Sequence, residues 1–362
     1  MMMHILKKAA FLSLFEISSI GGREQKGLLV LTYHRISTHS DFDDPLKVSL
    51  KSFERQISYL KENCHILSGE ELADIIKSRR SIPKKSVFIT FDDGWSDNYT
   101  NAFPILKQNE VPAIIFISTD YIDTSRTFWH EELADLLKKM PLPDSSQERQ
   151  ALQSILKGRP SELLQRIDRV LISPMPARMP LINDLISYLK AFQLEEIDDL
   201  IRDLNSAFGH ERREKYSDLL SWRQIAEMSE NNISFGSHTK SHSLLTNIPG
   251  EKVREELKES KKIIEEKTGR PVNFIAYPNG NFDSSIIKTA EEEGYLAGFT
   301  CVPGTNISYE RPFELKRKNV LEECSMGLGG KFSELFFKVE LSGIRENVRE
   351  WLRKEKAMNK GH

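Results

Sequence analysis

Short apolar runs alternate with stretches of helical periodicity along most of the 362 residues of this chain. The candidate strands are rich in β-branched and aromatic residues and cover 28–33, 65–67, 87–91, 113–117, 233–237, 273–277, 297–301 and 314–320. Helices are expected between them, at 53–63, 70–77, 249–267 and 284–293, and after a capping box at Ser221 and Gln224. This alternation predicts an α/β fold with a mostly parallel sheet, and seven or eight strands favour a barrel.

The region from about Thr124 to Leu220 breaks this alternation. It has helical periodicity and no good strand, and prolines divide it, among them Pro141, Pro143, Pro174, Pro176 and Pro180. We therefore expect a helical insertion, residues 124–220, between two strands of the barrel. An insertion on the loop side of a barrel is well placed to act as a lid or as a platform for a substrate.

Two separated motifs carry most of the chemistry. Residues 90–94 read Thr-Phe-Asp-Asp-Gly, and residues 237–242 read Ser-His-Thr-Lys-Ser-His. Each motif alone is often structural, because Asp-Asp-Gly is a common turn and two histidines four apart are often coincidental. Both, however, follow apolar runs, and α/β folds place active sites at the ends of buried strands. Their conjunction is therefore a much stronger indication of chemistry than either motif alone.

The two motifs together offer ligands for a metal ion. His238 and His242 are four residues apart, so both rings can reach one ion from a helical turn or a tight loop. Asp93 would complete three ligands and leave a position for water, as catalytic zinc sites do. Asp92 points away from Asp93 in a regular strand, but beyond the strand end it can approach that water as a general base. The pattern predicts metal-assisted hydrolysis.

These two motifs resemble the first and second motifs of the polysaccharide deacetylases, the NodB-homology domain of the family-four carbohydrate esterases. The resemblance covers about residues 29–320, with an insertion, and implies a distorted (β/α)7-8 barrel. It also implies that Asp92 is the catalytic base and that Asp93, His238 and His242 bind one divalent metal ion. These ligand types suit Zn²⁺, but also Co²⁺, Ni²⁺ or Fe²⁺.

A third motif lies at residues 274–280, where Phe-Ile-Ala-Tyr-Pro-Asn-Gly resembles another family segment, with Asn279 where tyrosine is usual. In the family the backbone N–H at that position stabilises an oxyanion, and a backbone donor survives a change of side chain. Asn279, Tyr277 and Trp129 are therefore predicted to contact the substrate or the oxyanion. Phe128 and Trp129 open the insertion, and they either stack on sugar rings or anchor the insertion to the barrel.

The general acid is expected before the first motif. No histidine lies between the second motif and the last residue, His362, so the late catalytic histidine of the usual family pattern is missing. Residues 31–36 resemble the opening of a permuted branch, which includes deacetylases of biofilm poly-N-acetylglucosamine. That resemblance implies that His34 is the general acid; alternatively, it caps or packs at a strand end. Arg317 resembles a late arginine of this branch and either orients Asp92 or is an ordinary surface residue.

The resemblance implies a hydrolase that removes N-acetyl groups from amino sugars of a polysaccharide or lipid-linked glycan. Two alternatives stay open: a non-catalytic glycan-binding protein on the same fold, and a hydrolase that removes an O-acetyl or N-formyl group. The expected partner is an N-acetylated glycan. The net charge of −2 gives no indication of a nucleic-acid partner.

Both ends of the chain are amphipathic. We expect an N-terminal helix at 1–27, the barrel at 28–330 and C-terminal helices at 331–362. The apolar run at 9–15 is too short to span a bilayer and resembles a signal peptide only weakly. The ends either contact a membrane surface peripherally or pack on the barrel, and a cell-envelope location is slightly favoured over the cytoplasm. The cysteines, Cys64, Cys301 and Cys324, show no metal-binding spacing and form no full disulfide framework.

Overall fold

The computed structural model describes residues 27–38, 46–140, 150, 154, 156–207, 218–327 and 331–342. The predicted N-terminal helix therefore lies outside the described residues, apart from Gly27, as does the predicted C-terminal segment beyond residue 342. Within the described ranges, no helix combines the length and apolar character that crossing a bilayer requires.

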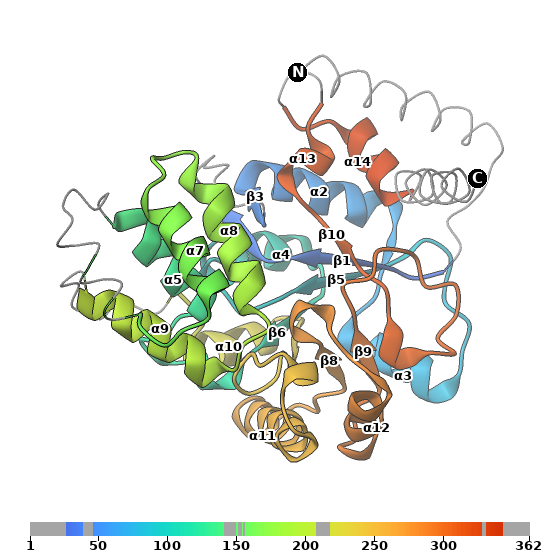
Figure 1. The fold of residues 1–362 in the computed structure, drawn as a ribbon. Coiled ribbons are helices and arrows are strands. Elements are labelled where there is room, and N and C mark those ends of the chain that lie inside the picture. Colours follow the sequence, from blue (N-terminus) through green and yellow to red (C-terminus); the bar gives the residue numbers. More distant parts are fainter. Residues whose placement is uncertain are drawn as a thin grey trace, which may run out of the picture.

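A parallel sheet curls into a distorted barrel at the centre of the molecule (Figure 1). Its strands are β1 (Leu29–Tyr33), β4 (His65–Ile66), β5 (Ser86–Phe91), β6 (Ala113–Ile117), β7 (Ile233–Ser237), β8 (Phe274–Ala276), β9 (Ala297–Phe299) and β10 (Lys318–Asn319). The order is β10-β1-β5-β6-β7-β8-β9, with β4 added beside β5, and every pair is parallel. The predicted α/β barrel is confirmed.

The segment after β9 leads back to β1. Leu315 forms a parallel bridge with Phe299 of β9, and three residues later Lys318 pairs with Leu31 of β1. The sequence predicted a strand over all of 314–320, but only Lys318–Asn319 is one. The prediction was too long because a 3-10 turn, Pro312–Glu314, occupies its start and the chain then crosses from one neighbouring strand to the other.

Helices cover the outside of the barrel (Figure 1). They are α2 (Leu50–Asn63), α3 (Gly69–Ser78), α4 (Phe103–Asn109), α10 (Trp222–Ser229), α11 (Gly250–Thr268), α12 (Ser284–Glu292), α13 (Glu322–Ser325) and α14 (Glu334–Leu341). The predicted capping box at Ser221 and Gln224 is present at the start of α10. A short parallel pair, β2 (Arg35–Ser37) and β3 (Lys47–Ser49), was not predicted.

The predicted helical insertion is confirmed between β6 and β7. It consists of α5 (Trp129–Lys139), α7 (Ser161–Leu171), α8 (Arg178–Leu189) and α9 (Leu194–Ala207), drawn in green in Figure 1. These helices enclose a second apolar core of their own, which includes Leu137, Ile167 and Leu200. Because it buries its own apolar side chains, the insertion packs as a subdomain with its own core at one end of the barrel.

Candidate metal and catalytic site

The functional side chains follow the carboxyl ends of neighbouring parallel strands. His34 comes directly after β1, Asp92 and Asp93 after β5, His238 after β7, and Asn279 two residues beyond Tyr277, which follows β8. Since parallel strands end at the same rim of a barrel, the topology brings residues more than 200 positions apart into one place.

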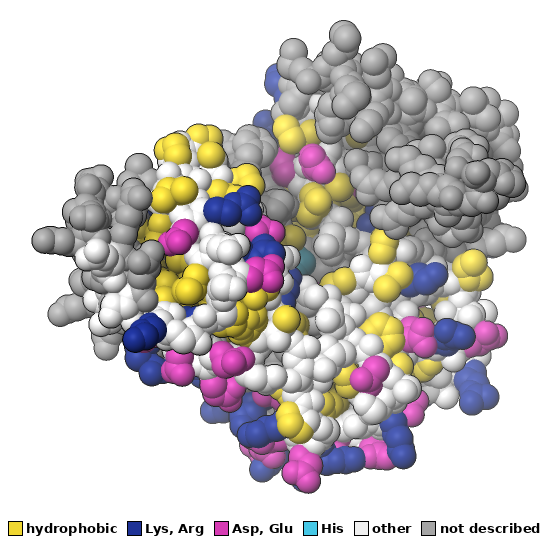
Figure 2. Space-filling model, in the orientation of Figure 1, with side chains coloured by type: hydrophobic (Ala, Val, Ile, Leu, Met, Phe, Trp, Pro, Cys, Tyr) yellow, Lys and Arg dark blue, Asp and Glu magenta, His cyan; other side chains and the backbone are white. Residues whose placement is uncertain are grey.

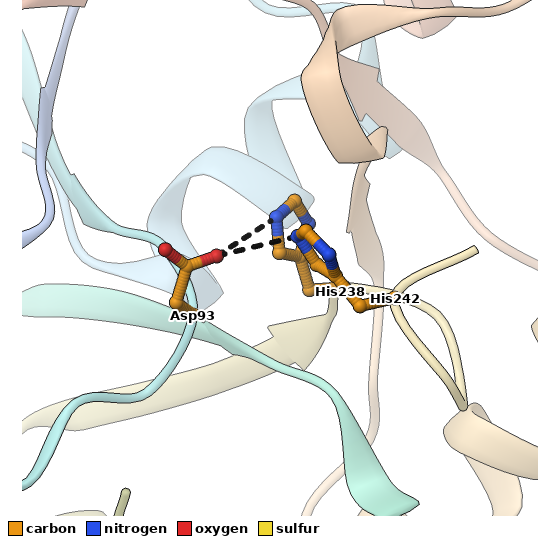
Figure 3. Close-up of side chains that lie close together, drawn as sticks. All are labelled: Asp93, His238 and His242. Atoms are coloured by element: carbon orange, nitrogen blue, oxygen red, sulfur yellow. Dashed lines mark ion pairs between the residues drawn. The ribbon is translucent and has the colours of Figure 1, made fainter. Parts of the chain in front are cut away.

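Asp93, His238 and His242 form a compact group of metal-ligand type (Figure 3). The Nε2 atoms of His238 and His242 lie 3.4 and 3.5 Å from the same atom, Oδ1 of Asp93. All three ligand atoms lie within 4.8 Å of one another. Two imidazole nitrogens and a carboxylate oxygen converging on one point are a donor set that a divalent ion accepts.

The hydrogen bonds around these ligands fix their orientation. Nδ1 of His238 lies 2.7 Å from the carbonyl oxygen of Ala276, so it carries the proton and leaves Nε2 free to bind an ion. Trp95 donates its indole N–H to Oδ2 of Asp93 at 3.1 Å, which leaves Oδ1 toward the histidines. The site therefore fits a metal ion in its donor chemistry and in the support of its ligands.

The backbone at the site adopts left-handed conformations that non-glycine residues rarely take. The φ angles are 74° at Asp93, 65° at Thr239, 59° at His242 and 57° at Asn279. Asp, Asn and His tolerate this region better than most residues, whereas the β-branched Thr239 at such an angle carries strain. Strain of this kind persists only where the surrounding contacts hold the backbone in place.

Glu256 of α11 supplies such contacts for the histidine loop. Its Oε2 accepts the backbone N–H groups of Lys240 and Ser241, each at 2.8 Å, and its Oε1 accepts the Ser241 hydroxyl at 2.6 Å. The carboxylate is only 9% exposed, so these bonds are shielded from water. Glu256 thus holds the turn that carries His238 and His242, a role that the sequence analysis missed.

Asp92 is held by Arg317. The guanidinium donates from Nη1 to Oδ1 and from Nη2 to Oδ2, and its Nε donates to the carbonyl of Thr300. Burial would raise the pKa of Asp92, but the charges of Arg317, His238 and His34 and the hydrogen bonds from Arg317 together hold that pKa below its ordinary value. Arg317 is buried rather than at the surface, and Asp92 is therefore an oriented carboxylate that stays ionised near neutral pH.

His34 also lies near Asp92. Its Nε2 is 4.0 Å from Oδ2 of Asp92, and the side chain is 16% exposed. The backbone carbonyl of His34 accepts a hydrogen bond from Asn98 at 2.8 Å. His34 lines the same cavity as Asp92 and Asp93, beside the predicted base.

These groups open into a cavity of about 320 Å³ between the barrel and the insertion. Figure 2 shows histidine atoms at the bottom of this hollow. The barrel contributes His34, Asp92, Asp93, His238, His242 and Asn279, and the insertion contributes Trp129, His130, Ile186, Lys190, Phe192, Gln193, Leu194 and Ile197. The insertion is thus one wall of the site, in keeping with the predicted lid or platform.

The three predicted substrate-contacting residues differ in their placement. Trp129 lines the cavity and also packs on the core of the insertion. Asn279 lines the cavity, whereas Phe128 is fully buried against Trp95 and anchors the insertion. For the Tyr277 side chain the prediction was wrong. It is fully buried and donates its hydroxyl to the carbonyl of Phe313 at 3.1 Å, so only its backbone is near the site.

The structure thus combines a parallel α/β barrel with a candidate metal site at the carboxyl ends of its strands. A family model described as polysaccharide deacetylase matches residues 79–142 and 195–298, and the gap between the two matches falls in the insertion. Over these segments the chain is similar to the polysaccharide deacetylases. The Bacillus subtilis protein YxkH, named for the same family, is 22% identical over 308 residues, which is 85% of this chain and 76% of that protein.

Shorter alignments match proteins whose names state an enzymatic activity. The poly-β-1,6-N-acetyl-D-glucosamine N-deacetylase of Staphylococcus epidermidis is 28% identical over 39% of this chain, and its alignment spans 54% of that protein. Among solved structures, the Streptococcus pyogenes deacetylase PplD matches with a TM-score of 0.53 and 20% identity, over 83% of this chain and 95% of its own. A polysaccharide deacetylase from Bacillus cereus matches with a TM-score of 0.52 and 23% identity, over 88% and 69%. These structural matches support the fold.

Proposed function

We propose that this protein is a metal-dependent hydrolase that removes N-acetyl groups from amino sugars of a glycan. The observation that carries the proposal is the pairing of two distinct groups in one cavity: three converging metal ligands, and beside them a separate carboxylate locked by Arg317. A protein that only bound glycans would need no oriented base next to a metal site. The named activity of the staphylococcal relatives, deacetylation of a poly-N-acetylglucosamine, supports the same substrate class.

Asp93, His238 and His242 would hold the ion, with Zn²⁺ the expected metal. When bound, such an ion polarises a carbonyl group and lowers the pKa of water. Asp92 is the proposed base that takes a proton from the attacking water, and Arg317 is a positioning residue that fixes its two oxygens. The Asn279 backbone N–H is proposed to donate to the oxyanion.

His34 is proposed to deliver the proton to the leaving amine. An amine is a poor leaving group unless it is protonated, so hydrolysis of an acetamide requires an acid as well as a base. His34 is the residue placed for it, since its ring lines the cavity next to Asp92. This assignment matches the branch of the family in which the catalytic histidine precedes the first motif.

The test is product analysis with purified full-length protein. We expect acetate and a free amine from N-acetylglucosamine oligomers, only with added Zn²⁺ or Co²⁺, and none from Asp92→Asn. Formate from an N-formyl sugar, or acetate from an O-acetyl sugar without amine formation, would instead support the alternative hydrolases. A protein that binds one metal ion and N-acetylated oligomers but releases no product would support the non-catalytic alternative.

A further inference from the structure

Among the described residues that line the cavity, Lys190 is the only lysine or arginine. It is the C-terminal capping residue of α8, in the insertion. Its backbone is docked on the barrel, because its carbonyl accepts a hydrogen bond from Asn247 at 2.7 Å and Gln193 donates to the Asn247 carbonyl at 2.9 Å. The position of this lysine relative to the metal ligands is thus set by contacts on both sides.

The ammonium group reaches the proposed oxyanion loop. Nζ of Lys190 donates to Oδ1 of Asn279 at 2.6 Å. The Asn279 amide is itself oriented, because its Nδ2 donates to Asn281 at 2.8 Å. The positive charge therefore lies beside the residue whose backbone is proposed to bind the oxyanion.

This charge has no anionic partner. Over the part of the chain that the structure describes, no carboxylate lies within ion-pair distance of Lys190, whereas nearby Lys240 pairs with Glu255 at 2.8 Å. The side chain is half-buried, and burial lowers its pKa below the ordinary value. An ammonium has three N–H donors, and Asn279 uses one of them. A half-buried cation that lacks a counter-charge costs free energy until an anion arrives.

We propose that Lys190 binds an anionic group, a phosphate or a carboxylate, carried on or next to the N-acetylated sugar, so that the insertion selects acidic glycans. This inference rests on the proposed function and names its substrate class. The cavity supports it in a second way. Apolar side chains of the insertion, Ile186, Phe192 and Leu194, line the same cavity as Lys190, and an apolar wall strengthens an ion pair with the substrate.

If Lys190 only stabilised the Asn279 loop through its hydrogen bond, substitutions that keep this bond would leave sugar binding unchanged. Lys190→Gln retains an N–H donor for Asn279 but removes the charge, and Lys190→Arg retains the charge. Lys138→Met serves as a matched control, because Lys138 is an exposed lysine of the same insertion that does not line the cavity. Thermal unfolding of each variant would show whether it is folded.

The experiment measures binding without turnover. Full-length protein is stripped of metal and dialysed, so that neither hydrolysis nor a metal–phosphate contact contributes, and calorimetry compares N-acetylglucosamine 6-phosphate, N-acetylmuramic acid and neutral N-acetylglucosamine. We expect at least one acidic sugar to bind about tenfold more tightly than the neutral one, equal to about 1.4 kcal/mol. Lys190→Gln should abolish that preference, whereas Lys190→Arg and Lys138→Met should retain it.

Two results would overturn the inference: no preference for either acidic sugar in the unmodified protein, or a preference that persists in Lys190→Gln. The two acidic probes also separate phosphate from carboxylate as the recognised group. Since binding is measured in the metal-free protein, failure of this inference is distinguishable from failure of the proposed hydrolysis, which the product analysis tests by itself.

Discussion

Arg317 binds both carboxylate oxygens of Asp92, with N···O distances of 2.7 and 2.8 Å, across 225 positions of sequence. Both residues are almost completely buried. A bidentate guanidinium fixes the plane of the carboxylate as well as its charge. The pair therefore determines which direction the proposed base faces.

Replacement of Arg317 by methionine should damage both activity and stability. It would leave a buried, unpaired carboxylate, which typically costs about 3–5 kcal/mol. Because Arg317 contributes the largest interaction that lowers the pKa of Asp92, its loss should raise that pKa. The acidic limb of the kcat profile should then shift to higher pH. Arg317→Lys keeps the positive charge but loses the bidentate geometry, so it should shift the acidic limb less. A kcat–pH profile whose acidic limb is unshifted in both variants would contradict the role of Arg317 in setting the pKa of Asp92.

Glu256→Ala should weaken metal binding without touching a ligand. The variant removes three hydrogen bonds from the strained loop that carries His238 and His242. Loss of outer support of this kind typically costs about 10–100-fold in metal affinity. Competition with a chelator measures it, and Glu266→Ala, an exposed carboxylate of the same helix, is the control. Equal affinities in the two variants would mean that Glu256 does not position the ligands.

His34→Ala should separate substrates by their leaving groups. If His34 protonates the leaving amine, kcat for an acetamide should fall by about 10²–10⁴-fold. Hydrolysis of an aryl acetate by the same site should fall far less, because a phenolate leaves without protonation. Parallel kinetics on the two substrates check this, and an equal loss on both would assign His34 a structural role.

Metal removal should lower stability as well as activity. Three ligands from two separate loops meet only in the folded protein, so an ion at about 100 times its Kd should add about 2.7 kcal/mol to the free energy of unfolding. Chelator-treated protein should therefore show a lower Tm, restored by Zn²⁺. His242→Ala should show little response of Tm to zinc, and a full response in that variant would place the ion elsewhere.

The sequence predicted the elements whose signal is local. β6 and β7 were predicted to the residue, because each is a short buried run. The motifs directly follow β5 and β7, so the candidate metal ligands could be predicted as well. Residues 314–320 were predicted less well, since this segment pairs in turn with two strands that are distant in the sequence.

The supporting residues could not be predicted in the same way. Glu256 is one of many acidic residues on a charged helix, and only the folded structure brings it under the histidine loop. Lys190 lies 89 positions from its partner Asn279, in a region whose sequence shows only helical periodicity. Tyr277 sits inside a motif, yet its side chain packs in the apolar layer that also contains Ile286 of α12, and Gly298 leaves room for its ring. Such contacts depend on how distant segments pack.

The most direct test of the central claim is a metal titration that follows bound ion and released acetate together. Metal-free protein is supplied with Zn²⁺ in steps, with an N-acetylated oligomer as substrate, and Asp92→Asn is treated identically. We predict that acetate release by the unmodified protein rises to a plateau at one ion per chain, and that Asp92→Asn binds the same single ion but releases no acetate. Acetate release by Asp92→Asn, or by unmodified protein without bound metal, would contradict the account.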